Sequence, residues 1–154
     1  MQKTKTLTSF KDACEIIRVY PGDEVTADQK AEIIFQAACV VLDRNPLILP
    51  DYSNIESEYA KSSLAHHKLE VVRNAVIGEW VPDWNKREYK WAPIFWMDSP
   101  GFRFDGSYFG FVGTYLAGGS RLSFETEKQS DFVGQDCIAF YRDFYGAVAL
   151  APAD

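Results

Sequence analysis

Residues 80–124 read WVPDWNKREYKWAPIFWMDSPGFRFDGSYFGFVGTYLAGGSRLSF, and the fold of this chain depends on them more than on any other part of the sequence. This stretch holds all four tryptophans and 13 of the 23 aromatic residues. Its hydrophobic pattern is typical of strands, whereas the sequence on both sides has the 3.6-residue repeat of helices. We therefore expect the stretch to form either the core sheet or a binding face.

The pattern predicts an antiparallel meander of three to four strands, over about residues 93–98, 101–104, 107–116 and 120–125. Asp105-Gly106 is among the strongest hairpin-turn signals, because both positions tolerate a positive φ. Gly118-Gly119 predicts a second turn. Pro93 indicates an edge strand or a strand that begins after the proline.

Helices are expected on both sides of this sheet, over about residues 10–19, 27–44 and 54–78 before it and 127–145 after it. Ser9 is a candidate N-cap, and capping boxes are predicted between Thr26 and Gln29 and between Thr126 and Gln129. The third helix should open at Ser53 and bury one stripe. That stripe is Ile55, Tyr59, Ser62, His66, Leu69, Val72 and Val76. The tail over 147–154 has no pattern and is expected to fray.

A length of 154 residues fits one domain with a sizeable core. We expect a single α+β domain over residues 1–154, with N-terminal helices, the aromatic meander and a C-terminal helix packed on the sheet.

Charge and cysteine content exclude several classes of protein. The net charge is −6, although residues 80–124 alone carry +1, and an acidic chain argues against binding to duplex nucleic acid. Cys14, Cys39 and Cys137 are far apart in the sequence, so neither a disulfide framework nor a Cys-x-x-Cys metal site is expected. No signal peptide or membrane span is evident, so a reducing, cytoplasmic setting is expected, with no membrane partner.

Several short motifs carry a resemblance: EWVPDW at 79–84, YKWAPIF at 89–95, GF at 101–102, GSRLSF at 119–124 and YRDF at 141–144. They resemble a family of small uncharacterised proteins of phages, prophages and mobile elements of gut bacteria, best over residues 63–145. Glu79, Ala92, Ser123 and Glu125 replace a glycine, an aromatic residue, a cysteine and a lysine of that pattern. The resemblance implies a phage or mobile-element setting and assigns no catalytic residue or cofactor.

Candidate catalytic or metal-binding groups are few. His66 and His67 are adjacent and would point about 100° apart on a helix, so a metal site would need Glu70 and a further ligand. A hydrogen-bonded structural histidine is the simpler interpretation. Glu79, Asp83, Asp98 and Asp105 would form paired carboxylates only if the fold brought two together. We predict no catalytic residue, metal or cofactor, and the sequence leans away from an enzyme.

A binding face is the sharper hypothesis. If the helices cover one face of the meander, the other face presents rings beside cations. The candidate binding residues are Trp80, Trp84, Trp91, Trp96, Arg103, Tyr108 and Arg121, with Lys86, Arg87 and Lys90 nearby. Such a face would bind a protein partner or a second copy of the chain, or alternatively stack the bases of a single-stranded nucleic acid or hold a sugar. The competing interpretation is that residues 80–96 cover the second face.

Overall fold

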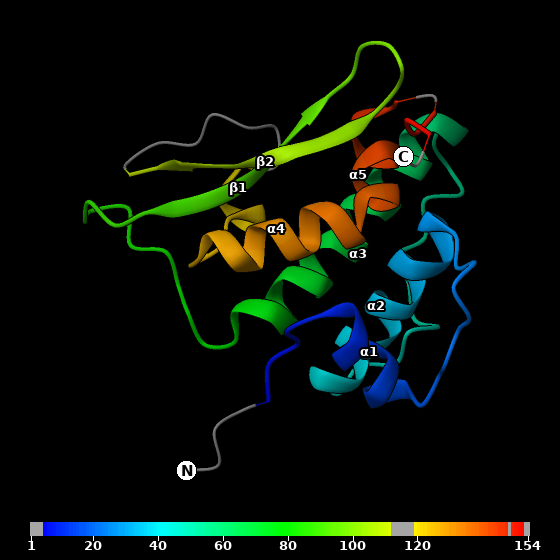
Figure 1. The fold of residues 1–154 in the computed structure, drawn as a ribbon, viewed down its shortest axis with the longest axis horizontal. Coiled ribbons are helices and arrows are strands. Elements are labelled where there is room, and N and C mark those ends of the chain that lie inside the picture. The colour runs from blue at the N-terminus through cyan, green and yellow to red at the C-terminus, as the bar shows by residue number, and fades with distance from the viewer. Residues whose placement is uncertain (1–4, 112–118, 148, 153–154) are drawn as a thin grey trace.

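The computed structural model describes residues 5–111, 119–147 and 149–152, and over these residues the fold is α+β. The helices are α1 (Phe10–Ile17), α2 (Ala27–Val41), α3 (Ser57–Ile77), α4 (Glu127–Asp136) and α5 (Ile138–Tyr145). Strands β1 (Lys90–Trp96) and β2 (Arg103–Gly110) form an antiparallel hairpin, and a 3-10 helix covers Gly119–Leu122. Figure 1 shows the hairpin lying over α4, with α3, α2 and α1 progressively further from the hairpin.

Local capping chemistry starts three of the helices. Ser9 accepts the Asp12 N–H at 3.0 Å, so the predicted N-cap of α1 is confirmed. Both predicted capping boxes are also confirmed, since Thr26 and Gln29 exchange bonds of 2.9 and 3.1 Å and Thr126 and Gln129 form the same pair on α4. Each box satisfies amides that a helix start leaves free.

Helix α3 begins later than predicted, at Ser57 rather than near residue 54, and no side chain caps it. Ser53 does not open the helix and lies instead in a local turn, where its N–H donates to Asp51 Oδ1 at 2.9 Å. The inner part of the predicted stripe is buried at Leu69, Val72 and Val76. The outer part was predicted wrongly, because Ile55 precedes the helix and both Ile55 and Tyr59 are exposed.

The hairpin turn lies at residues 97–102, and the turn predicted at Asp105-Gly106 is wrong. Ile94 pairs with Gly106 and Phe95 pairs with Phe104, so Asp105 is the extra residue of a β-bulge. Gly106 has φ 111°, which the bulge uses instead of a turn. The strands expected over 101–104 and 107–116 are therefore joined as the single strand β2.

The chain returns beside β1 without forming the predicted strand over 120–125. Gly119–Leu122 is a 3-10 helix, and Phe124 alone pairs with Trp91 through two backbone bonds of 2.8 and 2.9 Å. Residues 112–116 of the predicted strand and Gly118 of the second turn lie outside the described residues. The described part of the sheet has two strands.

The helix expected over 127–145 is two helices, α4 and α5, which meet at Cys137. The tail does not fray at residues 149–151, contrary to expectation. Phe102 N–H donates to the Ala149 carbonyl and Ala151 N–H donates to the Phe102 carbonyl, both at 3.0 Å. These bonds fix the hairpin turn to the end of the chain.

Helix α4 touches the hairpin closely at one glycine. A Cβ on Gly134 would lie 2.6 Å from Pro93 Cβ and 2.7 Å from the Phe104 ring. Ser107 of β2 adds a polar contact, with its Oγ 2.6 Å from Asp131 Oδ1 and 2.7 Å from Ser130 Oγ. Beneath this layer the helices bury a common core that includes Leu7, Ile34, Phe35, Leu69, Val72, Val133 and Tyr141.

Candidate functional site

The two faces of the hairpin have different surroundings. Pro93 and Ser107 face α4. The Phe95 ring stacks on the Phe102 ring with 4.8 Å between ring centroids, and its centroid lies 4.7 Å from that of Tyr141 of α5. Side chains alternate along a strand, so Ala92, Ile94 and Trp96 point to the opposite, outer face. The register adds Tyr108 and Arg103 to that outer face, because Tyr108 pairs with Ala92 and Arg103 pairs with Trp96.

The end of the hairpin next to the turn exposes an aromatic ring beside a neutralised cation. Trp96 is 49% exposed, and the following residue, Met97, is also exposed. The Arg103 guanidinium lies 5.9 Å from the Trp96 ring centroid and forms a 2.9 Å ion pair with Asp98. Arg103 also donates to the carbonyls of Ser99 and Gly101 at 3.4 and 3.3 Å. The arginine therefore holds the turn in shape and positions the tryptophan.

An open hollow of about 430 Å³ adjoins this turn. It is lined by Met97, Asp98, Ser99, Pro100, Gly101, Phe102, Gly146, Ala147 and Ala149. The lining is mostly apolar or backbone, and the tail bonds to Phe102 keep its two walls together. We call Trp96, Met97, Asp98, Arg103 and this hollow the hairpin-tip site. An apolar hollow of this kind can bind apolar side chains that a partner protein inserts into it.

Tyr108 extends the exposed apolar surface along the outer face. Its ring is 54% exposed and stacks on Phe109 at 5.5 Å. Ala92, Ile94 and Gly106, between Tyr108 and Trp96 on this face, are partly exposed. The outer face thus carries two exposed rings separated by small or aliphatic residues.

The other three predicted tryptophans are partly buried and lie away from the tip. Trp80 packs against the core with Arg73 at 5.9 Å from its ring, and Trp84 lies 5.0 Å from Lys90 Nζ. Trp91 contacts Phe109 at 5.2 Å, within a cluster that also contains Tyr89 and Phe111. Of the predicted binding residues, the structure therefore places Trp96, Arg103 and Tyr108 on one face of the hairpin. Trp80, Trp84 and Trp91 pack against other side chains instead.

The expected basic residues do not form one patch. Lys90 is only 3% exposed, and its ammonium donates to the carbonyls of Lys86, Glu88 and Phe111 at 3.2, 3.3 and 2.7 Å. Arg121 is exposed but sits on the 3-10 helix, where it lies 3.7 Å from Glu70 of α3. The prediction that Lys90 is a surface cation beside the rings is wrong.

The histidine pair lies on α3, apart from the hairpin tip. His66 Nδ1 is 3.5 Å from Glu70 Oε1 and its ring lies 5.0 Å from Phe144. Burial lowers the pKa of His67, which favours the neutral ring. Within the described residues, no group of three His, Cys, Asp or Glu side chains is placed to hold a metal ion.

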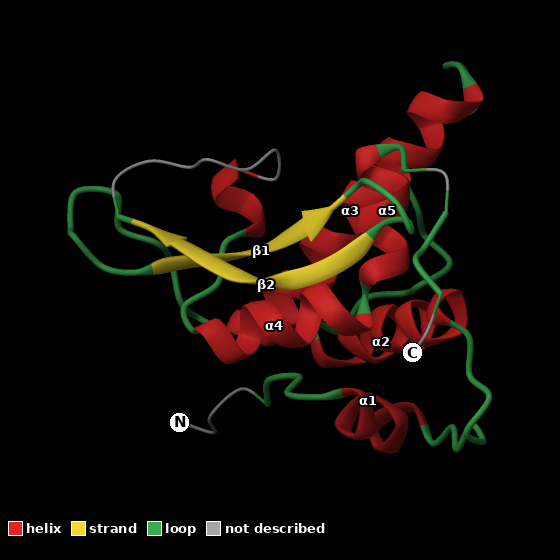
Figure 2. Cartoon of the chain, turned by 45° about the horizontal axis from the view of Figure 1, so that its top comes forward, coloured by secondary structure: helices red, strands yellow, loops and turns green. Residues whose placement is uncertain are grey.

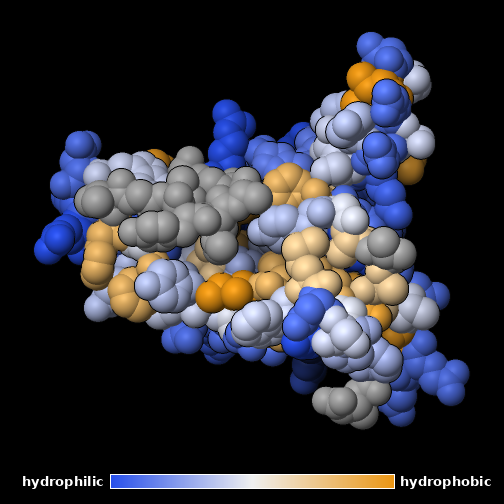
Figure 3. Space-filling model, turned by 90° about the horizontal axis from the view of Figure 1, so that it is seen from above, coloured by the Kyte–Doolittle hydropathy of each residue, from blue (hydrophilic) through white to orange (hydrophobic). Residues whose placement is uncertain are grey.

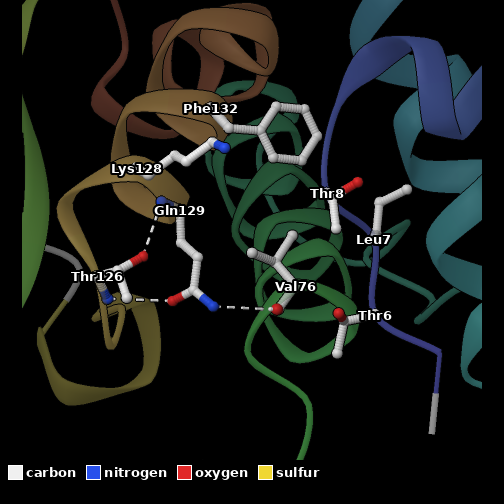
Figure 4. Close-up of a pocket in the computed structure, with 8 residues that line it drawn as sticks. All are labelled: Thr6, Leu7, Thr8, Val76, Thr126, Lys128, Gln129 and Phe132. Carbon is white, nitrogen blue, oxygen red and sulfur yellow. Dashed lines mark hydrogen bonds between the residues drawn. The ribbon is translucent and has the colours of Figure 1, made fainter.

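A smaller hollow of about 140 Å³ lies where the N-terminal segment meets the start of α4 (Figure 4). Phe132 stands on one side, and Leu7 and Thr8 stand on the other. Gln129 donates from Nε2 to the Val76 carbonyl at 3.4 Å while its Oε1 serves the capping box. Its amide is thus used to join α4 to α3.

The sequence analysis named Asp98 only as a possible member of a carboxylate pair, and it did not single out Met97 or the other residues that line the tip hollow. Pro100-Gly101 is a turn signal that would have located this turn, but the aspartate-glycine pair further along is the stronger pattern. The contribution of Gly146, Ala147 and Ala149 depends on the tail returning to Phe102, which no local pattern announces.

No described helix is both long and apolar enough to cross a membrane. Comparisons with protein-family models, with curated proteins and with solved structures found no match for this chain.

Proposed function

We propose that this protein is a small non-enzymatic interaction protein that binds a protein partner through the hairpin-tip site and the outer face of the hairpin. The observation that carries the proposal is the exposure of Trp96 and Tyr108 on one face of a hairpin that packs against α4 through its other face. Aromatic residues held in a fixed geometry are enriched among the residues that dominate binding at protein interfaces. The apolar hollow beside Trp96 would accept a side chain of the partner.

The charges around the rings favour a protein over a single-stranded nucleic acid. Phosphate binding needs cations that are available to the ligand. Arg103 is engaged by Asp98 and by turn carbonyls, and Asp98 and Asp105 add exposed negative charge to the same hairpin. Arg121 is paired with Glu70 on another element. These pairings make single-stranded nucleic acid the less favoured ligand, and the experiment must distinguish it from a protein partner.

The sequence resemblance over residues 63–145 would place this partner in a phage or mobile-element setting, and the expected reducing setting of the chain would place it in the cytoplasm.

The test places a photo-crosslinking amino acid in cells at position 97, the exposed neighbour of the Trp96 anchor. It then identifies the crosslinked protein and measures its affinity with both proteins purified. We expect Trp96→Ala with Tyr108→Ala to weaken that affinity by about tenfold to a hundredfold, as the loss of two anchor residues does. The matched control is Tyr20→Ala, which removes an exposed ring in the segment after α1 and should change the affinity by less than about twofold.

Three results would count against the proposal. The first is an affinity that the double variant leaves unchanged. The second is a crosslinked product that is only a second copy of the chain, with a dimer in sedimentation experiments. The third is salt-sensitive quenching of tryptophan fluorescence by single-stranded DNA or RNA, lost in Trp96→Ala, which would establish the nucleic-acid alternative.

A further inference from the structure

A second exposed apolar surface lies far from the hairpin in the sequence, on the connector before α3 and the first turn of that helix. We call residues 47–60 the α3 arm. Leu47 is 87% exposed, Ile48 is 72% exposed and Tyr59 is 60% exposed, and Leu49 and Ile55 are also exposed. Figure 2 shows the start of α3 projecting from the body at the upper right, and in Figure 3 this projection is mainly hydrophilic with a small hydrophobic patch near its end.

The exposed apolar residues of the arm lie beyond the part of α3 that the body covers. Leu69, Val72 and Val76 are buried, whereas Tyr59 in the first turn of α3 is exposed and Ile55 lies before the helix. Single exposed apolar side chains are ordinary, but a run of large ones along one segment marks an interaction surface.

The arm also contains a place for an inserted side chain. An open hollow of about 530 Å³ lies between the connector and the first turns of α3. Its lining residues are Pro50, Tyr52, Ser53, Ile55, Ser57, Ala60, Lys61 and Leu64. The hollow thus joins Pro50, which follows Leu47, Ile48 and Leu49, to Ile55 and the start of the helix.

The charge of the arm decides what fits. Residues 47–60 contain three acidic side chains, Asp51, Glu56 and Glu58, and no lysine or arginine. All three acids are exposed. The next cation, Lys61, is paired with Asp143 of α5 at 3.4 Å. An apolar surface with an acidic border complements an apolar surface with a basic border.

We propose that the α3 arm docks a basic amphipathic segment of another protein, whose apolar side chains cover Ile48, Ile55 and Tyr59 while its lysines or arginines pair with Asp51, Glu56 and Glu58. A second copy of the chain is the poorer occupant. In a symmetric contact each arm would face the other, so the three carboxylates of both copies would be opposed. This surface is independent of the hairpin-tip site, and its test uses different residues.

The test titrates the full-length protein with a labelled peptide of about 14 residues built from leucine and lysine at helical spacing, followed by fluorescence anisotropy. We expect saturable binding that weakens when salt is raised from about 0.05 M to about 0.5 M. Glu56→Lys with Glu58→Lys, and separately Ile55→Ser with Tyr59→Ser, should each weaken binding about tenfold or more.

Matched controls separate docking at the arm from general attraction between a cationic peptide and an acidic protein. Glu125→Lys with Glu127→Lys reverses two exposed acids at the same spacing elsewhere, and Tyr20→Ser with Val81→Ser removes two exposed apolar side chains elsewhere. Both controls should stay within about twofold of wild type, and circular dichroism melting checks that every variant is folded.

The proposal is overturned if the control variants lose as much affinity as the arm variants, if the peptide does not bind saturably, or if a leucine-glutamate peptide binds equally well. It is also overturned if sedimentation shows a dimer that the arm variants dissociate, because the occupant would then be a second copy.

Discussion

At the scale of single residues, the buried Tyr141 hydroxyl lowers the stability of the core. Tyr141 is buried, its oxygen has no hydrogen-bond partner among the described residues, and burial raises its pKa well above the ordinary value. A buried hydroxyl without a partner loses its bonds to water and gains none. We expect Tyr141→Phe to raise the free energy of unfolding by about 1 kcal/mol, measured by urea denaturation.

Tyr108→Phe is the matched control, because it removes an exposed hydroxyl and should change stability by less than about 0.5 kcal/mol. Destabilisation by Tyr141→Phe would mean that the hydroxyl has a partner in solution, such as a buried water molecule.

Lys90 shows why residue roles at the candidate site were only partly predictable. Its sequence context, KREYKW, is that of a surface cation beside aromatic residues. The structure buries the side chain because carbonyls of residues 86, 88 and 111 converge on its ammonium. That convergence follows from the hairpin register, which pairs Lys90 with Gly110, and register is a non-local property. Trp96 and Tyr108, predicted as binding residues, are exposed in the structure, and their role in binding stays a prediction.

At the scale of elements, helix starts were predictable where the capping groups are neighbours in the sequence. Thr26 and Thr126 each find their partner three residues later, so the local sequence contains the whole interaction. The sheet was less predictable, because a glycine with positive φ serves a bulge as well as a turn. Gly106 satisfies both patterns, and only the pairing of Ile94 and Phe95 across the hairpin distinguishes them.

The packing of α4 against the hairpin gives the element-scale prediction. A methyl group on Gly134 would overlap Pro93 and Phe104 of the two strands, so the hairpin would have to move away from the helix. Overpacking of this kind costs about 1–3 kcal/mol, while alanine regains up to about 1 kcal/mol in helix propensity. We expect Gly134→Ala to lower the free energy of unfolding by about 1–2 kcal/mol, measured by urea denaturation.

Gln135→Ala is the control on the same helix, since Gln135 is exposed and its replacement should be nearly neutral. A Gly134→Ala variant as stable as wild type would show that the hairpin can shift on α4. The contact with α4 would then not fix the position of Trp96.

At the scale of the whole molecule, the α+β class and the helix–sheet–helix order followed from where the hydrophobic period changes. The exposure of the α3 arm did not follow from the sequence. The spacing of Ile55 and Tyr59 predicts that both are buried, whereas the structure exposes both. The return of the tail to Phe102 was also hidden, since backbone bonds leave no mark on side-chain pattern. Contacts between distant segments therefore account for most of what the sequence left open.

One such long-range contact couples the stability of the molecule to pH. Arg142 of α5 donates to Asp28 at the start of α2 through bonds of 2.7 and 3.2 Å, and these bonds lower the pKa of Asp28. The folded state therefore binds a proton at Asp28 less readily than the unfolded chain, whose aspartate pKa is about 3.9. The stabilisation from this pair is present above that value and is lost as the pH falls through the lowered folded pKa.

We expect Asp28→Asn to reduce the free energy of unfolding at pH 7 by about 0.5–1 kcal/mol, a modest value because solvent screens the largely exposed carboxylate. Below about pH 4 the difference from wild type should shrink, and it should vanish once wild-type Asp28 is protonated in both states. Urea denaturation at a series of pH values measures this difference. A difference that persists at about pH 2 would assign the effect to helix packing rather than to the charge on Asp28.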